Sequence, residues 1–176
     1  QSGHDILHGG PGNDWLETAG GNDHLNGGPG DDRIFSHGGS NVIVMGDGYD
    51  AVRVGDGNDR ISAGGTGNKV VDAGAGDDFI MGGTGDDILT GAGGLDVLYG
   101  GEGDDTLVIA DLAPQRIDGG TGEDTLQIEG ASLNIDLGDL PISGIEAVDI
   151  TGTGDNVLTL NVMDVLDASD SSNTLK

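Results

Sequence analysis

Aspartate recurs at one position of a nine-residue repeat that runs through most of the chain. The repeat reads Gly-Gly-x-Gly-x-Asp-x-U-x, with U aliphatic, and is complete in residues 9–17, 27–35 and 100–108. Carboxylates in fixed register beside glycine turns provide hard oxygen ligands, so the pattern indicates a row of cation sites. The sixth position holds Asp in eleven of fourteen aligned repeats: Asp5, Asp14, Asp23, Asp32, Asn41, Asp50, Asp59, Asn68, Asp78, Asp87, Asp96, Asp105, Gln115 and Asp124.

The eighth position of the repeat is always aliphatic. Its members are Leu7, Leu16, Leu25, Ile34, Ile43, Val52, Ile61, Val70, Ile80, Leu89, Leu98, Leu107, Ile117, Leu126 and Ile135. One apolar residue in nine does not make an amphipathic helix, which needs three or four in every two turns. The x-U-x segment instead predicts a short strand whose middle side chain points inward.

The glycine-rich remainder of each repeat must reverse the chain. Two repeats then make one coil, with parallel strands stacked on opposite sides of a thin aliphatic core. Two steps are ten residues long, from Asn68 to Asp78 and from Asp105 to Gln115, and we interpret each as a one-residue bulge in a turn. The expected fold class is therefore all-β, a parallel β-roll.

These repeats resemble the repeats-in-toxin (RTX) nonapeptide over residues 3 to about 127. The resemblance implies a calcium-loaded parallel β-roll, in which each ion lies between two turns eighteen residues apart on one side. Its implied ligands are the two sixth-position carboxylates, the carbonyls of positions 2 and 4 of one turn, and the carbonyls of positions 1 and 3 of the next.

Carried onto this chain, the resemblance implies about seven strong calcium sites. The complete carboxylate pairs are Asp5/Asp23, Asp59/Asp78 and Asp78/Asp96 on one side, and Asp14/Asp32, Asp32/Asp50, Asp87/Asp105 and Asp105/Asp124 on the other. Implied carbonyl ligands include Gly10, Gly12, Gly28, Gly30, Gly55, Gly57, Gly74, Gly76, Gly83, Gly85, Gly101 and Gly103. Sites that use Asn41, Asn68 or Gln115 lose a charge, and we expect them to be weak, completed by water, or empty.

The composition supports calcium and excludes several classes of partner. The chain has no Cys and no cluster of His for zinc, and flexible oxygen-rich turns suit Ca²⁺ better than the strict octahedron of Mg²⁺. A formal charge of −26 disfavours nucleic acid and anionic membranes, and no apolar run is long enough to insert into a membrane. With 37 Gly and this charge, the metal-free chain is expected to be disordered.

No catalytic residues are predicted. Nucleophile-elbow and zinc-helix motifs are missing from the sequence, and carboxylates in glycine turns are poor candidates for a glycosidase acid, which needs a raised pKa in an apolar pocket. His4, His8, His24 and His37 fall at four different repeat positions and are expected to be exposed spacers. An ice-binding lattice is disfavoured because the outward strand positions are irregular. One sheet is expected to expose an apolar patch for a neighbouring segment, module or ligand, made of Val42, Val44, Phe79, Met81, Val97 and Tyr99.

Beyond residue 127 the repeat fades, and residues 128–176 are expected to form a strand-rich cap that continues the solenoid and covers its open edge. Leu133 replaces the acid while Ile135 keeps the core position. Strands are expected over residues 132–137, 145–150 and 157–162, with a helical turn or bent strand over 162–166. Residues 143–150 with 156–160 and 164–166 resemble segments between the modules of very large bacterial RTX adhesins.

We therefore expect a calcium-binding, calcium-induced folding module of a type I-secreted bacterial surface adhesin, located outside the cell. Calcium ions and neighbouring modules of a longer parent protein are the expected partners, together with a host-surface or carbohydrate ligand. Gln1 is not a natural start, so the chain is expected to be part of something longer. Two alternatives remain open: an RTX module of a secreted protease, lipase, epimerase or toxin, and a carbohydrate- or peptide-binding module.

Overall fold

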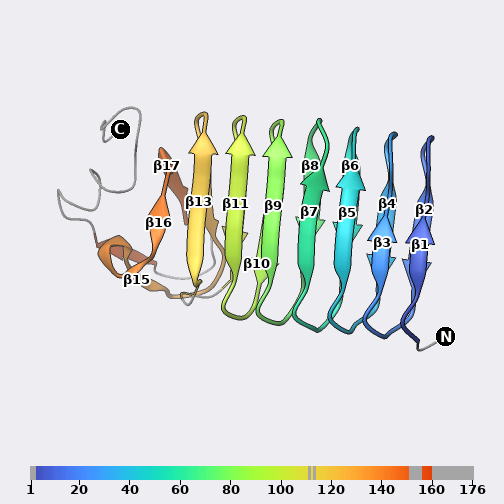
Figure 1. Cartoon of the computed structure of the whole chain (residues 1–176). Helices are drawn as coiled ribbons and strands as arrows, with labels where there is room; N and C mark the ends of the chain where they lie inside the picture. The colour runs from blue at the N-terminus through green and yellow to red at the C-terminus, as the bar shows by residue number, and fades with distance from the viewer. Residues whose placement is uncertain (1–2, 111, 113, 151–155, 160–176) are drawn as a thin grey trace.

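The chain winds into coils that each add one strand to each of two parallel sheets (Figure 1). The computed structural model describes residues 3–110, 112, 114–150 and 156–159. The first sheet contains, in order, β1 (Ile6–His8), β3 (His24–Asn26), β5 (Val42–Gly46), β7 (Arg60–Gly64), β9 (Phe79–Thr84), β11 (Val97–Glu102), β13 (Arg116–Thr121) and β16 (Ile142–Ser143). The second contains β2 (Trp15–Thr18), β4 (Arg33–Ser36), β6 (Asp50–Arg53), β8 (Lys69–Asp72), β10 (Ile88–Ala92), β12 (Thr106–Ile109), β14 (Thr125–Ile128) and β17 (Ala147–Asp149).

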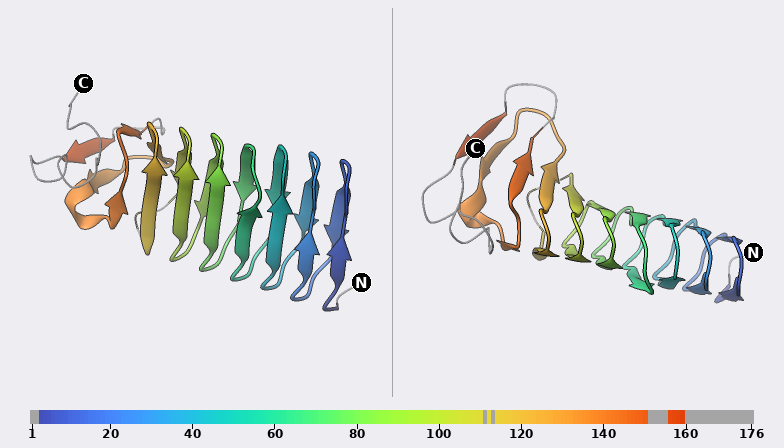
Figure 2. Two further views of the ribbon diagram at one scale, coloured as in Figure 1. Left: turned by 45° about the horizontal axis from the view of Figure 1, so that its top comes forward. Right: turned by 90° about the horizontal axis from the view of Figure 1, so that it is seen from above.

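The strand register follows the nine-residue repeat. Ile43 of β5 lies opposite Ile61 of β7, and Leu89 of β10 lies opposite Leu107 of β12. The coils stack along one axis, from β1 and β2 at one end to β16 and β17 at the other (Figure 2). The predicted fold class, an all-β parallel β-roll, is confirmed.

The core contains two side chains from many strands, where the sequence predicted one. In β4 both Ile34 and Ser36 are buried, and in β5 both Ile43 and Met45 are buried. The strands run beyond the predicted x-U-x segment, and side chains of a strand alternate between its faces. The first position of the following repeat therefore joins the eighth position in the core.

The first ten-residue step is placed differently from its prediction. Lys69 lies opposite Asp50, and Val71 lies opposite Val52. Val71 is buried whereas Val70 is only half-buried, so Val71 holds the core position that the sequence assigned to Val70. The extra residue lies in the turn before Lys69, not after it, and Asn68 consequently moves to the exposed fifth position.

The C-terminal part extends both sheets and adds a small one. Strand β16 pairs with β13, and β17 pairs with β14. The small sheet consists of β15 (Asn134–Asp136) and β18 (Val157–Thr159), and a 3-10 turn, η1 (Leu137–Asp139), follows β15. Strands β15 and β17 are shorter than the strands predicted over 132–137 and 145–150. The end of the strand predicted over 157–162 and the feature expected over 162–166 lie outside the described residues. In the described part of the chain, no helix is long and apolar enough to cross a membrane.

Candidate metal-binding turns

The sixth-position aspartates form two buried rows, one along each side of the roll. Their exposed fraction does not exceed 3% for Asp23, Asp32, Asp50, Asp59, Asp78, Asp87, Asp96, Asp105 and Asp124. Asp5 and Asp14, in the first coil, are only half-buried. Buried carboxylates require partners, because leaving water costs an ion several kcal/mol.

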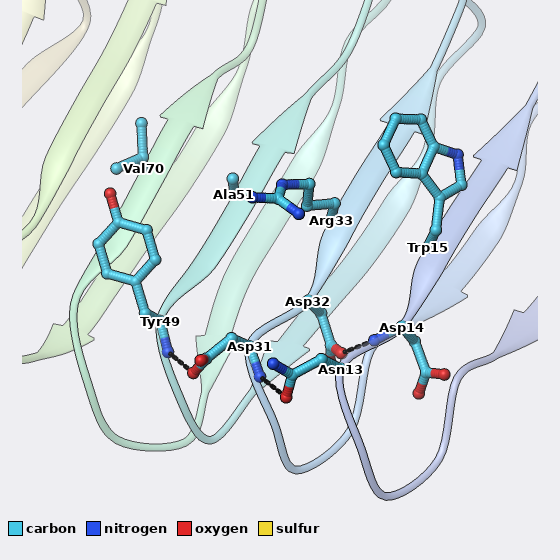
Figure 3. Close-up of a pocket in the computed structure, with 9 residues that line it drawn as sticks. All are labelled: Asn13, Asp14, Trp15, Asp31, Asp32, Arg33, Tyr49, Ala51 and Val70. Carbon is cyan, nitrogen blue, oxygen red and sulfur yellow. Dashed lines mark hydrogen bonds between the residues drawn. The ribbon is translucent and has the colours of Figure 1, made fainter.

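One oxygen of each carboxylate after the first coil is held by the backbone of the preceding coil. Oδ1 of Asp32 accepts the amide N–H of Asp14 at 2.8 Å (Figure 3), and Oδ1 of Asp105 accepts that of Asp87 at 2.8 Å. The same bond joins every carboxylate pair that the sequence predicted. The structure thus brings together all seven predicted pairs; calcium binding at each remains a prediction.

The other oxygen of most of these carboxylates is buried and accepts no hydrogen bond within the described chain. This holds for Oδ2 of Asp14, Asp23, Asp32, Asp59, Asp78, Asp87 and Asp105. Burial raises the pKa of Asp78 and of Asp105 to about 7, and the charges of neighbouring aspartates in the row add to this effect. A row of ionised oxygens without counter-charge is unfavourable, so a cation is the partner that the row lacks.

Backbone oxygens lie close to the same carboxylates. A Cβ at Gly9 would lie 2.6 Å from Oδ2 of Asp14 and 2.5 Å from the carbonyl oxygen of Gly27 in the next coil, so the approach of these oxygens requires glycine at this position. The predicted carbonyl ligands, apart from Gly55, have positive φ, for example 95° at Gly10 and 128° at Gly101. Carboxylate and carbonyl oxygens together are a ligand set that fits Ca²⁺.

One turn in the row that contains Asp32 and Asp50 holds a positive charge that the chain itself supplies, the ammonium group of Lys69. Nζ of Lys69 lies 2.8 Å from the Gly46 oxygen, 2.7 Å from the Gly48 oxygen, 2.9 Å from Oδ2 of Asp50 and 3.0 Å from the Thr66 oxygen. These oxygens come from positions 2, 4 and 6 of one turn and position 3 of the next. Lys69 and Asp50 side chains are both 0% exposed.

The placement of Asn68 at the sixth position, on which its predicted role as a weak ligand rested, is therefore wrong. Its side chain is exposed, and the sixth position belongs to Lys69. The predicted weak positions Asn41 and Gln115 behave differently from one another. Asn41 is buried in its row, and its Nδ2 donates to the Gly39 oxygen and to Oδ1 of Asp59, both at 2.8 Å. Gln115 is exposed.

Two features of the turns were not predicted. The fifth positions form an outer ladder in which Asn13 Oδ1 accepts the Asp31 N–H and Asp31 Oδ1 accepts the Tyr49 N–H, both at 3.0 Å (Figure 3). In the last coil, Oε2 of Glu146 accepts the Asp124 N–H at 2.9 Å and takes the sixth-position role. The enrichment of Asp and Asn at position 5 could have indicated the ladder, but Glu146 stands outside the nine-residue spacing.

The four histidines are exposed, and the predicted apolar patch is partly covered. His4, His8, His24 and His37 are exposed, as expected. The predicted patch is less open than expected, because only Val42 and Met81 of its six residues are exposed. The Arg60 guanidinium lies 4.5 Å from the centre of the Phe79 ring, so arginine side chains cover part of this face.

The side chains alone do not make a dense metal cluster. Among the described residues, no group of three or more His, Cys, Asp or Glu side chains is placed to hold an ion. Any site must therefore combine carboxylates with backbone carbonyls, just as Lys69 contacts one carboxylate and three carbonyls. This donor set lacks the nitrogen and sulfur ligands that zinc prefers.

A comparison with protein families agrees with this donor set. The model of the RTX calcium-binding nonapeptide repeat matches four times, at residues 1–34, 8–43, 17–52 and 72–107, which together span half of the chain. The chain belongs to the RTX family. It is therefore an RTX calcium-binding module. Residues 53–71 and 108–176 lie outside the matches, and the first of these two stretches contains the Lys69 turn. No curated protein and no solved structure matched this RTX chain.

Proposed function

We propose that this RTX chain is a calcium-induced folding module of a bacterial surface adhesin that leaves the cell by type I secretion. The observation that carries the proposal is the row of buried carboxylate oxygens without hydrogen-bond partners, such as Oδ2 of Asp32, Asp78 and Asp105. A folded chain with this feature needs a cation beside these oxygens. The unfolded chain, whose carboxylates are hydrated, does not.

The proposed mechanism couples neighbouring coils. Asp32, Asp78 and Asp105 each belong to two carboxylate pairs, so Asp105 faces both Asp87 and Asp124 along its row. A bound Ca²⁺ supplies two positive charges to such a pair. It is coordinated by the carboxylate oxygens of the pair and by the carbonyl oxygens of the turns. Because each pair joins successive coils, the folding of one coil favours the next, and the transition is cooperative.

The proposed secretion route is supported by the same dependence of folding on calcium. A chain of net charge −26 repels itself and stays extended where calcium is scarce, which suits passage through a channel. Extracellular calcium modules bind with dissociation constants on the order of 10⁻⁴–10⁻³ M, so folding would follow export. The adhesin assignment is supported by the resemblance of residues 143–150 to inter-module segments of large RTX adhesins.

Circular dichroism tests the folding proposal. We expect a disordered spectrum in chelator, a β-rich spectrum after calcium addition, and no equivalent change with magnesium at the same concentration. A β-rich spectrum and a melting temperature that are the same in chelator and in calcium would refute the proposal. Reading the coding sequence on either side tests the setting, because an adhesin array and a catalytic domain of a protease, lipase or epimerase differ plainly.

A second candidate, carbohydrate binding, is favoured by a groove over β2, β4 and β6. Trp15, Arg33 and Tyr49 line it together with Asp31, and the Trp15 and Tyr49 side chains are exposed (Figure 3). Exposed aromatic rings beside carboxylates can stack on sugar rings and hydrogen-bond their hydroxyls. Glycan-array binding that Trp15→Ala abolishes and Met81→Ala, on the other sheet, preserves would support it; no glycan binding would exclude it.

A further inference from the structure

The four contacts of Lys69 describe a cation position more closely than an ordinary lysine pocket. An ammonium group has three N–H donors, whereas Nζ has four oxygens between 2.7 and 3.0 Å from it. Three of these oxygens belong to backbone carbonyls, which do not titrate. The turn therefore surrounds a positive charge with oxygens, as a metal site does.

The Asp50 carboxylate shows the consequence. Its Oδ1 accepts the Asp32 N–H at 2.9 Å, as in the other turns of the row, and its Oδ2 accepts Lys69 Nζ at 2.9 Å. The corresponding oxygens Oδ2 of Asp32 and Asp87, in the neighbouring coils, are buried and accept no hydrogen bond within the described chain. The presence of Lys69 is thus the difference between a satisfied and an unsatisfied carboxylate in the same row.

We propose that the Lys69 ammonium group takes the place of one calcium ion, so that the Asp50 and Lys69 coils are joined by a cation built into the chain. The row then contains two runs of calcium sites, one over Asp14, Asp32 and Asp50 and one over Asp87, Asp105 and Asp124. The link between these runs is independent of calcium. This inference rests on the proposed function, because it assumes that the neighbouring turns bind calcium.

Two substitutions at Lys69 test it, each with a control that makes the same charge change at an exposed site. Lys69→Met removes the charge but keeps a long side chain in the space, and Lys69→Asp restores the family residue. The matched controls are Arg53→Met and Arg53→Asp, because the Arg53 side chain is 73% exposed and its Nε lies 3.3 Å from Oδ2 of Asp72.

The number of bound calcium ions is measured by equilibrium dialysis, and the calcium concentration at half-folding is measured by circular dichroism. Lys69→Asp should bind at least one ion more per chain than wild type, whereas Arg53→Asp should bind the same number. Lys69→Met should raise the half-folding concentration by about tenfold or more, since a buried Asp50 charge loses its partner, whereas Arg53→Met should change it less than about twofold.

Equal ion counts for wild type and Lys69→Asp, together with equal half-folding concentrations for Lys69→Met and Arg53→Met, would overturn the inference and leave the proposed function standing. A wild-type chain that binds no calcium would overturn the proposed function instead. If neither Lys69 variant folds, acetylation of the wild-type protein tests whether the Lys69 ammonium group is buried. Lys69 should react at least about a hundredfold more slowly in calcium than in guanidinium, and fast reaction in the folded protein would refute a buried ammonium.

Discussion

Two neighbouring stretches of one row solve the same electrostatic problem differently. At Asp87 and Asp105, the Asp105 Oδ1 accepts the Asp87 N–H between coils, and both Oδ2 atoms are left buried without a hydrogen bond in the described chain. At Asp50 and Lys69, the chain itself provides a positive charge 2.9 Å from the carboxylate. We therefore expect the first stretch to depend on a cation from solution and the second to be independent of it.

The opposite row contains an intermediate solution. Asn41 occupies the sixth position, and its Nδ2 donates to a turn carbonyl and to Oδ1 of Asp59. The Asn41 amide therefore donates hydrogen bonds to these two oxygens but adds no formal charge to the turn. The three turn types, with aspartate, lysine or asparagine, share the hydrogen bond between coils, and we expect them to differ in their demand for calcium.

The largest effect is expected where a charge is removed from the calcium-dependent stretch. Asp105→Asn keeps an acceptor for the Asp87 N–H but removes a carboxylate shared by two pairs. The calcium concentration at half-folding, followed by circular dichroism, should rise by about tenfold or more, which corresponds to about 1.4 kcal/mol per tenfold.

The matched control is the adjacent residue. Asp104→Asn also removes one charge and keeps an acceptor, but Asp104 is exposed in the outer ladder, where its Oδ1 accepts the Glu123 N–H. Its half-folding concentration should change less than about twofold. If both variants shift equally, net charge and not the buried row determines the calcium demand.

Protons should partly replace the cation at the aspartate turns. Burial raises the pKa of Asp78 and Asp105 to about 7 and that of Asp87 to about 6, above the ordinary value near 4. A raised folded-state pKa favours the protonated form, so this contribution to stability is full below about pH 4 and is lost as the pH rises through about 6 to 7.

In metal-free buffer the β-roll should therefore be more populated at about pH 5 than at about pH 8, as followed by far-ultraviolet circular dichroism. Asp105→Asn should show a smaller pH dependence, because one titrating group is gone. A metal-free fold that is less stable at the lower pH than at the higher would contradict the electrostatic account.

The smallest effect is expected from converting the intermediate turn. Asn41→Asp would place a carboxylate between Asp23 and Asp59. Oδ1 of Asn41 already accepts the Asp23 N–H, and the Asn41 N–H donates to Oδ1 of Asp59. Half-folding should need about twofold to fivefold less calcium, since affinity rises with ligand charge. Ser40→Asp adds the same charge at the exposed fifth position and should have no such effect; equal shifts would count against a site at Asn41.

Much of the roll could be predicted because the repeat is regular and its physics is local. Constant spacing is enough to place Leu89 opposite Leu107 and to join Asp87 to Asp105, and both contacts are present in the fold. The outer ladder was not predicted because Asn, Asp and Ser all serve at position 5, so no single residue type marks it. Glu146 was not predicted because it lies twenty-two residues after Asp124, outside the constant spacing.

The Lys69 turn was misplaced for a physical reason. A ten-residue step does not reveal where its extra residue lies, and Asn68 is closer in type to aspartate than lysine is. The buried contacts decide the register, because Lys69 alone can supply a charge to Asp50 while Val71 fills the core. Such a substitution keeps the geometry of the site but reverses the sign of the charge at the ligand position.

The most direct test is an anomalous-scattering measurement on crystals grown in calcium. The account predicts calcium peaks between the paired aspartates, including Asp14 with Asp32 and Asp87 with Asp105, and no peak at Nζ of Lys69. A folded β-roll with no anomalous peaks beside these carboxylates would contradict the account.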